Sequence, residues 1–184
     1  MLNRAEAWKL VEKYVSSRNL LLHMIAVEAI MRGLAERLGE NAEEWGLAGL
    51  LHDIDFELTK DEPHRHTLEA EKILDGHIPD ELIRTIKAHN HEYTGIKPEK
   101  PIDYALIAAD AVSGLIVACA LVMPSRSLEE VSLRTLLKKF KQKDFARKVS
   151  RDRIKMCEKL GLGLEEFLEI SLESMKKIRH ELGL

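Results

Sequence analysis

The chain has 184 residues, a length that suits one domain built around a single core. Hydrophobic residues make up 45% of the sequence and charged residues 32%, which excludes a disordered chain. The aromatic share of 5% favours helices over a β-sandwich or barrel, and the formal net charge of −3 is too small to indicate a polyanionic partner for the whole chain.

Apolar residues at helical spacing predict three helices in the first third of the chain, over residues 4–15, 19–38 and 42–53. Asn19 is the expected N-cap of the second helix and Gly39 its stop. On this helix His23 shares the apolar stripe and is expected to point inward, whereas Glu28 falls on the opposite, polar side. Mixed charges and Pro63 then predict a loop over residues 54–65.

The middle of the chain predicts two short helices followed by a long apolar one. His66 is expected on the first short helix and His89 on the inward face of the second. The long helix, over residues 102–122, carries Asp110 near its middle. A carboxylate there would cost roughly 2.5 to 3.5 kcal/mol in a membrane, and no Lys/Arg cluster or aromatic belt flanks the segment. We therefore expect a buried core helix whose aspartate needs a partner.

The last third predicts helices over residues 127–141, 144–160 and 163–182, and no segment shows convincing strand alternation. The expected fold is an all-α bundle of about eight helices, forming one domain over residues 1–184. Residues 134–159 contain eleven Lys/Arg against three Asp/Glu, a local balance of +8. This segment is expected to be mainly a solvated helical face. The alternative is that one face of it attracts phosphate and extends a binding surface, through the basic residues Lys138, Lys139, Lys141, Lys143, Arg147, Lys148, Arg151 and Arg153. Nucleic-acid binding is the less favoured alternative, because Phe140 and Phe145 are its only aromatic residues.

Cysteine usage and the N-terminus predict a cytoplasmic protein. Cys119 and Cys157 show no metal-type spacing and no disulfide framework, which indicates a reducing compartment. The first twelve residues alternate charge with apolar side chains, unlike a signal peptide. Four Asn and a single Gln among so many charged residues are typical of thermophile proteins.

Histidines on inward helix faces are the main chemical signal in the sequence. Seven of the eight histidines fall between positions 23 and 91. Four of them are expected on or beside apolar stripes of different helices: His23, His52, His66 and His89. A single inward histidine is usually a satisfied core residue. Four of them with Asp53 and Asp110 would leave many buried polar groups without partners, and one metal centre would satisfy them together.

The motifs around these residues resemble a known family. The order is His23, then His52-Asp53 in Gly-Leu-Leu-His-Asp-Ile-Asp, then Asp110 in Ala-Ala-Asp-Ala-Val-Ser. This pattern resembles the HD-domain metal-dependent phosphohydrolases. His66 in His-x-x-x-Ala and His89 in Ile-x-x-His are similar to the subgroup typified by the HD domain of ribonuclease Y. The resemblance covers residues 18–123 and leaves 124–184 as a C-terminal helical extension of unknown role.

The resemblance implies a ligand set for one or two divalent ions per chain. His23, His52, Asp53 and Asp110 would bind the first ion. His66 and His89 would bind a second, with Asp53 bridging. Imidazole and carboxylate ligands suit Mn, Fe, Co, Ni or Zn, and Mg is also admitted, so the donor types leave the metal open.

The resemblance also implies hydrolysis of a phosphomonoester or phosphodiester, with a small phosphorylated molecule such as a nucleotide as substrate. A metal-activated hydroxide would attack the phosphorus in line. Asp53 is expected at the reaction centre, and Asp55, Glu57 and Asp103 are candidates to orient water or move protons. Solvated loop positions for Asp55 and Glu57, and a helix N-cap for Asp103, are the alternatives. The candidates for substrate binding are Arg18, Lys87 and His91.

Two other functions remain open at this point. One is a regulatory module that binds a nucleotide in the same pocket without hydrolysing it. The other is a purely structural helical protein whose histidines are satisfied in its core. Neither alternative, nor the enzyme, calls for a membrane partner, and the sequence leaves the oligomeric state open.

Overall fold

The computed structural model describes residues 2–184, which contain helices and no strand. This confirms the predicted all-α class. The α-helices are α1 (Arg4–Tyr14), α2 (Arg18–Leu38), α3 (Ala42–Leu51), α4 (Phe56–Thr59), α5 (Leu68–Leu74), α6 (Asp80–His89), α7 (His91–Thr94), α8 (Pro101–Leu121), α9 (Leu133–Lys141), α10 (Arg151–Ile154), α11 (Leu164–Lys177) and α12 (Arg179–Leu182). Two 3₁₀ helices, η1 (Leu128–Glu130) and η2 (Lys155–Leu160), complete the described chain.

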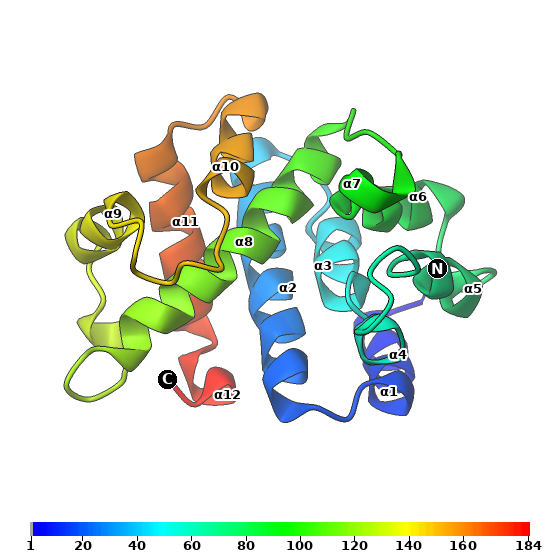
Figure 1. The fold of residues 1–184 in the computed structure, drawn as a ribbon, viewed down its shortest axis with the longest axis horizontal. Helices are drawn as coiled ribbons and strands as arrows, with labels where there is room; N and C mark the ends of the chain where they lie inside the picture. The colour runs from blue at the N-terminus through cyan, green and yellow to red at the C-terminus, as the bar shows by residue number, and fades with distance from the viewer. Residues whose placement is uncertain (1) are drawn as a thin grey trace.

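The helix α8 forms the centre of the molecule. It crosses over α2 and α11, which pack against each other, and it also contacts α6, α9 and α10 (Figure 1). By length and composition it is the one helix among residues 2–184 that could cross a membrane, yet most of its residues are buried inside the protein. Residues from α8 and from the C-terminal helices belong to the same hydrophobic core. The chain after position 124 is therefore packed onto the rest.

The helices α2 and α3 pack unusually closely. At Gly49 an added Cβ would lie 2.9 Å from backbone atoms of Glu28, so only glycine allows this approach. Glu28 itself is buried, which corrects the expected exposed position. Its Oε1 accepts hydrogen bonds from Nε of Arg4 at 2.8 Å and from Nε of Arg32 at 3.0 Å. The two guanidinium groups compensate the buried carboxylate.

Several helix boundaries differ from those expected. Ser17 rather than Asn19 caps α2. A short helix, α4, lies inside the expected loop over 54–65, and His66 precedes α5 instead of lying on it. The helix expected over 144–160 begins only at Arg151, after an irregular segment.

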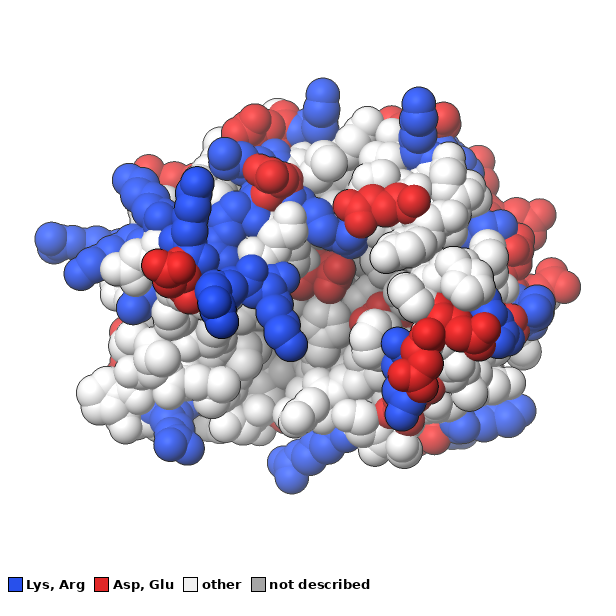
Figure 2. Space-filling model, in the orientation of Figure 1, with Lys and Arg blue, Asp and Glu red and all other residues white. Residues whose placement is uncertain are grey.

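The basic residues of the C-terminal half gather on one side of the surface. Figure 2 shows Lys and Arg side chains concentrated where α9 and α10 lie, beside a hollow near the middle of this face. Lys138, Lys141, Lys143, Arg147 and Lys148 are all exposed. Most of the segment is thus a solvated face.

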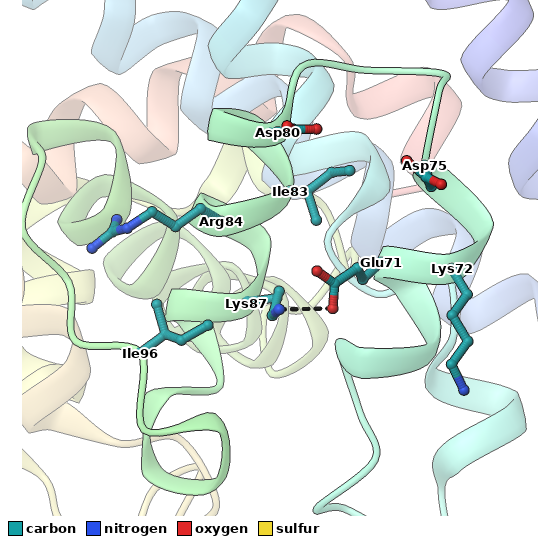
Figure 3. A pocket seen from close by; sticks show the side chains of 8 residues that line it. All are labelled: Glu71, Lys72, Asp75, Asp80, Ile83, Arg84, Lys87 and Ile96. Carbon is teal, nitrogen blue, oxygen red and sulfur yellow. Dashed lines mark hydrogen bonds and ion pairs between the residues drawn. The ribbon is translucent and has the colours of Figure 1, made fainter.

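An ion pair ties α5 to α6. Nζ of Lys87 lies 2.7 Å from Oε2 of Glu71, at the wall of a depression that Arg84 and Asp80 also line (Figure 3). This depression shares no lining residue with the histidine cluster described below.

Candidate metal centre

The His52-Asp53 pair lies where α3 ends, and both residues are buried. Asn41 caps the start of α3 by accepting hydrogen bonds from the backbone N–H groups of Glu43 and Glu44. At the other end, Nδ1 of His52 donates to the carbonyl of Gly49 at 2.8 Å. This bond directs Nε2 of His52 away from its own helix and towards α2 and α8.

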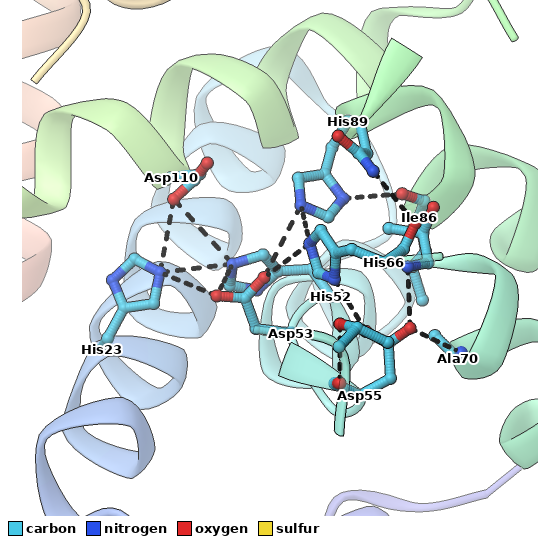
Figure 4. Close-up of polar contacts among 12 residues, drawn as sticks. His23, His52, Asp53, Asp55, His66, Ala70, Ile86, His89 and Asp110 are labelled. Atoms are coloured by element: carbon cyan, nitrogen blue, oxygen red, sulfur yellow. Dashed lines mark hydrogen bonds and ion pairs between the residues drawn. The ribbon is translucent and has the colours of Figure 1, made fainter. Parts of the chain in front are cut away.

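One half of the site joins α2, α3 and α8. Nε2 of His23 lies 3.3 Å from Nε2 of His52 and 3.3 Å from Oδ1 of Asp110. The second oxygen of Asp53, Oδ2, is 3.6 Å from Nε2 of His23 and 3.5 Å from Nε2 of His52. Asp110 therefore finds the partner that its place in an apolar helix requires (Figure 4).

The other half of the site lies on the opposite side of the same carboxylate. Oδ1 of Asp53 is 3.3 Å from Nε2 of His66 and 3.6 Å from Nε2 of His89. The two imidazoles approach each other, with 3.3 Å between their Nε2 atoms. Asp53 thus lies between two pairs of histidines and offers one oxygen to each pair (Figure 4).

Asp55 holds His66 in place. It is wholly buried, and its Oδ1 accepts a hydrogen bond from Nδ1 of His66 at 2.8 Å. Its Oδ2 accepts from the backbone N–H groups of Thr67 at 2.7 Å and Ala70 at 2.9 Å. Thr67 adopts a φ of +72°, which a β-branched residue rarely does. These bonds stabilise the turn that presents His66 to Asp53.

The hydrogen bonds of the imidazole rings leave every Nε2 facing the same space. Nδ1 is hydrogen-bonded to Gly49 in His52, to the Ile86 carbonyl in His89 and to Asp55 in His66. In His23 it lies 3.1 Å from Oγ of Ser113, whose own proton goes to the Asp110 carbonyl. Nδ1 is then the protonated nitrogen, and the lone pair of each Nε2 is directed at its neighbours and at two carboxylates. Such a donor set fits divalent cations.

Protons compete with a cation for these nitrogens. Burial opposes protonation of His66, but Asp53 and Asp55 outweigh it and raise its pKa to about 9. Burial likewise opposes protonation of His23, and Asp110 and Asp53 still raise its pKa above the ordinary value. For His52, burial outweighs the attraction of Asp53 and Asp110, and the neighbouring His89 and His23 add to the effect of burial, so its pKa falls to about 4. Burial would raise the pKa values of Asp53 and Asp110, yet the adjacent histidines hold both well below the ordinary value.

A cavity of about 400 Å³ opens onto the cluster. Five of the six clustered side chains line it: His23, Asp53, His66, His89 and Asp110. Leu20, Phe56 and Asn90 add apolar and amide surface, and Arg153 adds a positive charge. Phe56 is 45% exposed and meets the His66 ring edge-on at 5.6 Å between centroids. The cavity thus combines imidazole and carboxylate groups, the positive charge of an arginine and an apolar edge.

All six residues expected to bind metal come together in one cluster. Two of the expected catalytic residues do not line its cavity. Asp55 is neither a solvated loop residue nor free to act on water, because both its oxygens are engaged as described above. Asp103 is buried near the start of α8, where it is hydrogen-bonded to Arg84, Thr85 and the backbone N–H groups of Glu99 and Lys100. It acts as a cap of that helix.

The remaining polar candidates have other partners or positions. Glu57 accepts hydrogen bonds from the backbone N–H groups of Ser16 and Ser17, just before α2. Among the three residues expected to bind substrate, Lys87 is paired with Glu71, and exposed Arg18 and half-buried His91 do not line the cavity. Residues that lie close in the sequence to the expected metal-binding residues therefore do not lie beside them at the cavity.

Sequence reasoning named Arg153 only as one of eight basic residues of its segment that could extend a phosphate-binding surface, and did not single it out as a residue of the site. Its Nη2 lies 2.8 Å from the carbonyl oxygen of His89 and 3.3 Å from Oδ2 of Asp110. The positive charge balance of residues 134–159 was a signal, but it does not distinguish one arginine that points inward from ten basic residues around it.

The comparisons with known proteins agree with this geometry. The HD domain family matches residues 20–113, just over half of the chain and a span that includes all six clustered residues. Ribonuclease Y of Mesoplasma florum is 33% identical over 104 residues, which are 55% of this chain and 20% of that protein. Ribonuclease Y of Fervidobacterium nodosum is 35% identical over 97 residues, covering 52% of this chain and 18% of the relative. Ribonuclease Y of Aquifex aeolicus is 37% identical over 99 residues, covering 53% of this chain and 17% of the relative.

These alignments cover only a small part of each relative. It spans about a fifth of the length of the curated relatives it matches. No solved structure gave a significant match. The match to the HD domain, together with the histidine and aspartate cluster that it encloses, shows that this chain belongs to the HD-domain family.

Proposed function

We propose that this protein is a metal-dependent phosphohydrolase that cleaves a phosphomonoester or phosphodiester of a small molecule, in the first instance a nucleotide. The observation that carries the proposal is the position of Asp53. Its two oxygens face two pairs of histidine Nε2 atoms, with Asp110 completing one of the pairs. His23, His52, Asp53 and Asp110 would hold one divalent cation, and His66 and His89 would hold a second with Asp53.

A divalent cation at such a site lowers the pKa of water towards about 7 and polarises a phosphoryl oxygen. The protein's own groups provide the remaining requirements. Asp55 and the carbonyls of Gly49 and Ile86 fix the tautomers and orientations of three histidines. Burial of His52, Asp53 and His89 strengthens the electrostatic interactions in the cluster.

The composition of the cavity supports a nucleotide as substrate. A phosphate needs positive charge, which Arg153 and the cations would provide. The organic part of the molecule needs an apolar surface, and Phe56 and Leu20 line the cavity beside the ligands. A planar base could pack on the exposed ring of Phe56.

The test is phosphate release by metal-loaded protein. Wild type, Asp53→Asn and the control His180→Ala, which changes an exposed histidine of α12, are compared with Mn²⁺, Co²⁺, Ni²⁺, Zn²⁺ and Mg²⁺. The substrates are p-nitrophenyl phosphate, bis-p-nitrophenyl phosphate, nucleoside monophosphates and cyclic nucleotides. We expect turnover by wild type and His180→Ala and a loss of at least about 10³-fold in Asp53→Asn, because metal and reaction centre share this residue. Equal activity in wild type and Asp53→Asn would disprove the proposal.

The same panel distinguishes an enzyme from a regulatory module. A module that only binds nucleotides would be stabilised thermally by a nucleotide that stays intact after prolonged incubation with metal. Recovery of the unchanged nucleotide from every incubation, together with such stabilisation, would replace the proposed hydrolase by a sensor.

A further inference from the structure

We propose that Arg153 binds the substrate phosphate, so that the C-terminal extension supplies part of the active site. This inference rests on the function proposed above. Arg153 lies in α10, outside the segment 20–113 that matches the HD domain. It is nevertheless the one Lys or Arg among residues 2–184 that lines the cavity over the histidine cluster.

Protein contacts hold the guanidinium of Arg153 in position but leave some of its N–H donors without a partner in the described chain. Only Nη2 has partners among residues 2–184, the carbonyl of His89 and Oδ2 of Asp110. Nε and Nη1 carry three further N–H groups with no hydrogen bond to the described chain. The side chain keeps 23% of its surface exposed, at the cavity. A fork of free donors beside a metal centre suits a phosphate oxygen pair.

Asp110 divides its two oxygens between the cluster and this arginine. Oδ1 lies 3.3 Å from His23, and Oδ2 lies 3.3 Å from Nη2 of Arg153. Arg153 is thus next to the ligand atoms rather than on the outer rim of the cavity. A phosphate held by both a cation at the cluster and Arg153 would need to move little to react.

The preceding segment fixes the position of Arg153. Arg151 donates hydrogen bonds to six carbonyl oxygens of the irregular segment and the end of α9: those of Lys139, Phe140, Gln142, Phe145, Ala146 and Val149. Ser150 caps α10 by accepting a hydrogen bond from the backbone N–H of Arg153 at 3.2 Å. A side chain held by such a backbone reaches the site with little loss of entropy on binding.

The experiment measures phosphate binding separately from turnover. Wild type, Arg153→Gln, Arg153→Lys and Lys148→Ala are loaded with the same metal, and bound metal is counted by elemental analysis. Gln keeps a donor for the His89 carbonyl without the charge, and Lys restores the charge without the fork. Lys148 is an exposed basic residue of the same segment and serves as the matched control. Inorganic phosphate is then titrated by calorimetry and by thermal shift.

We expect Arg153→Gln to keep the metal content of wild type while its Kd for phosphate rises at least tenfold. Its kcat/KM for p-nitrophenyl phosphate should fall roughly 10²-fold, in line with the loss of one charged donor at a reacting oxygen. Arg153→Lys should lie between Gln and wild type, and Lys148→Ala should match wild type. Circular dichroism melting checks that each variant is folded. If Arg153→Gln is unfolded, the phosphate affinity of Arg153→Lys tests the inference.

Three results would overturn the inference. They are phosphate affinity within twofold of wild type in Arg153→Gln, loss of metal in proportion to the loss of phosphate binding, and no phosphate binding by metal-loaded wild type. The second would make Arg153 a support for Asp110 instead. Phosphate binding that depends on Arg153 in a protein without turnover would leave this inference standing and refute the proposed hydrolase alone.

Discussion

Asp55 and His66 form a buried carboxylate–imidazole pair, with 2.8 Å between Oδ1 of the aspartate and Nδ1 of the histidine. The other ring nitrogen of the same imidazole, Nε2, lies 3.3 Å from Oδ1 of Asp53. A carboxylate behind a histidine ligand fixes its tautomer and makes it a stronger base.

Asp55→Asn should therefore weaken the second cation without removing its ligands. We expect metal affinity in this half of the site to fall about 10- to 100-fold, the usual effect of losing such a partner. Titration calorimetry with Mn²⁺ measures it, and Asp61→Asn, which alters an exposed acid nearby, is the control. Unchanged affinity for both ions would show that Asp55 only stabilises the turn.

His66→Ala should lower the bound metal from two ions per chain to one. The four ligands of the other half, His23, His52, Asp53 and Asp110, remain intact in this variant. Elemental analysis of protein purified without chelator gives the count. One ion in both wild type and variant would reduce the proposed centre to a single-ion site, and no ion in either would favour the structural interpretation of the histidines.

The stability of the metal-free protein should be greatest near pH 6.5. His66 has a folded-state pKa of about 9, above its ordinary 6.5, so its contribution is fully present below pH 6.5 and is lost as the pH rises to 9. His52 has a folded-state pKa of about 4, so the unfolded chain takes up its proton first and stability falls from pH 6.5 down to 4. The free energy of unfolding in urea, measured from pH 4 to 9, shows the fall in stability on both sides of pH 6.5.

Bound metal should offset the loss of stability between pH 6.5 and 9. Because a cation requires neutral His66, apparent metal affinity should rise by up to about tenfold per pH unit below 9 and then level off. The gap in melting temperature between metal-bound and metal-free protein should therefore widen from pH 6.5 to 9. A gap that narrows over this interval contradicts the assignment of His66 as a ligand.

Gly49→Ala should destabilise the protein and disturb the first half of the site together. The new Cβ would meet the backbone of Glu28 at 2.9 Å, forcing apart the helix that carries His23 and the one that ends at His52. We expect a loss of about 1 to 3 kcal/mol, typical of overpacking. Gly163→Ala is the matched control, since a Cβ there meets nothing within 4 Å and φ is −67°. Equal urea midpoints in the two variants would refute the close-packing argument.

The sequence contained enough information for the helical class and for the histidine and aspartate set, because each of these residues shares a periodic apolar stripe or adjoins a helix end. It could not place Asp55, whose burial depends on a turn with Thr67 in the left-handed region, outside any periodic pattern. It could not single out Arg153 either. The path of residues 142–150 follows from hydrogen bonds to Arg151, and local periodicity instead favoured a continuous helix over 144–160.

The single carboxylate of Asp53, placed between the two histidine pairs, has a consequence for how the centre fills. Each ion would neutralise part of the charge that attracts the other, so the two occupancies are thermodynamically linked and the linkage is reciprocal. Titration of the metal-free protein should then give two separated steps rather than two equivalent sites. Because both ions would share Asp53, the element bound at one position would affect the affinity at the other. A protein with two different metals would therefore have properties that differ from the average of the two forms that each carry a single metal.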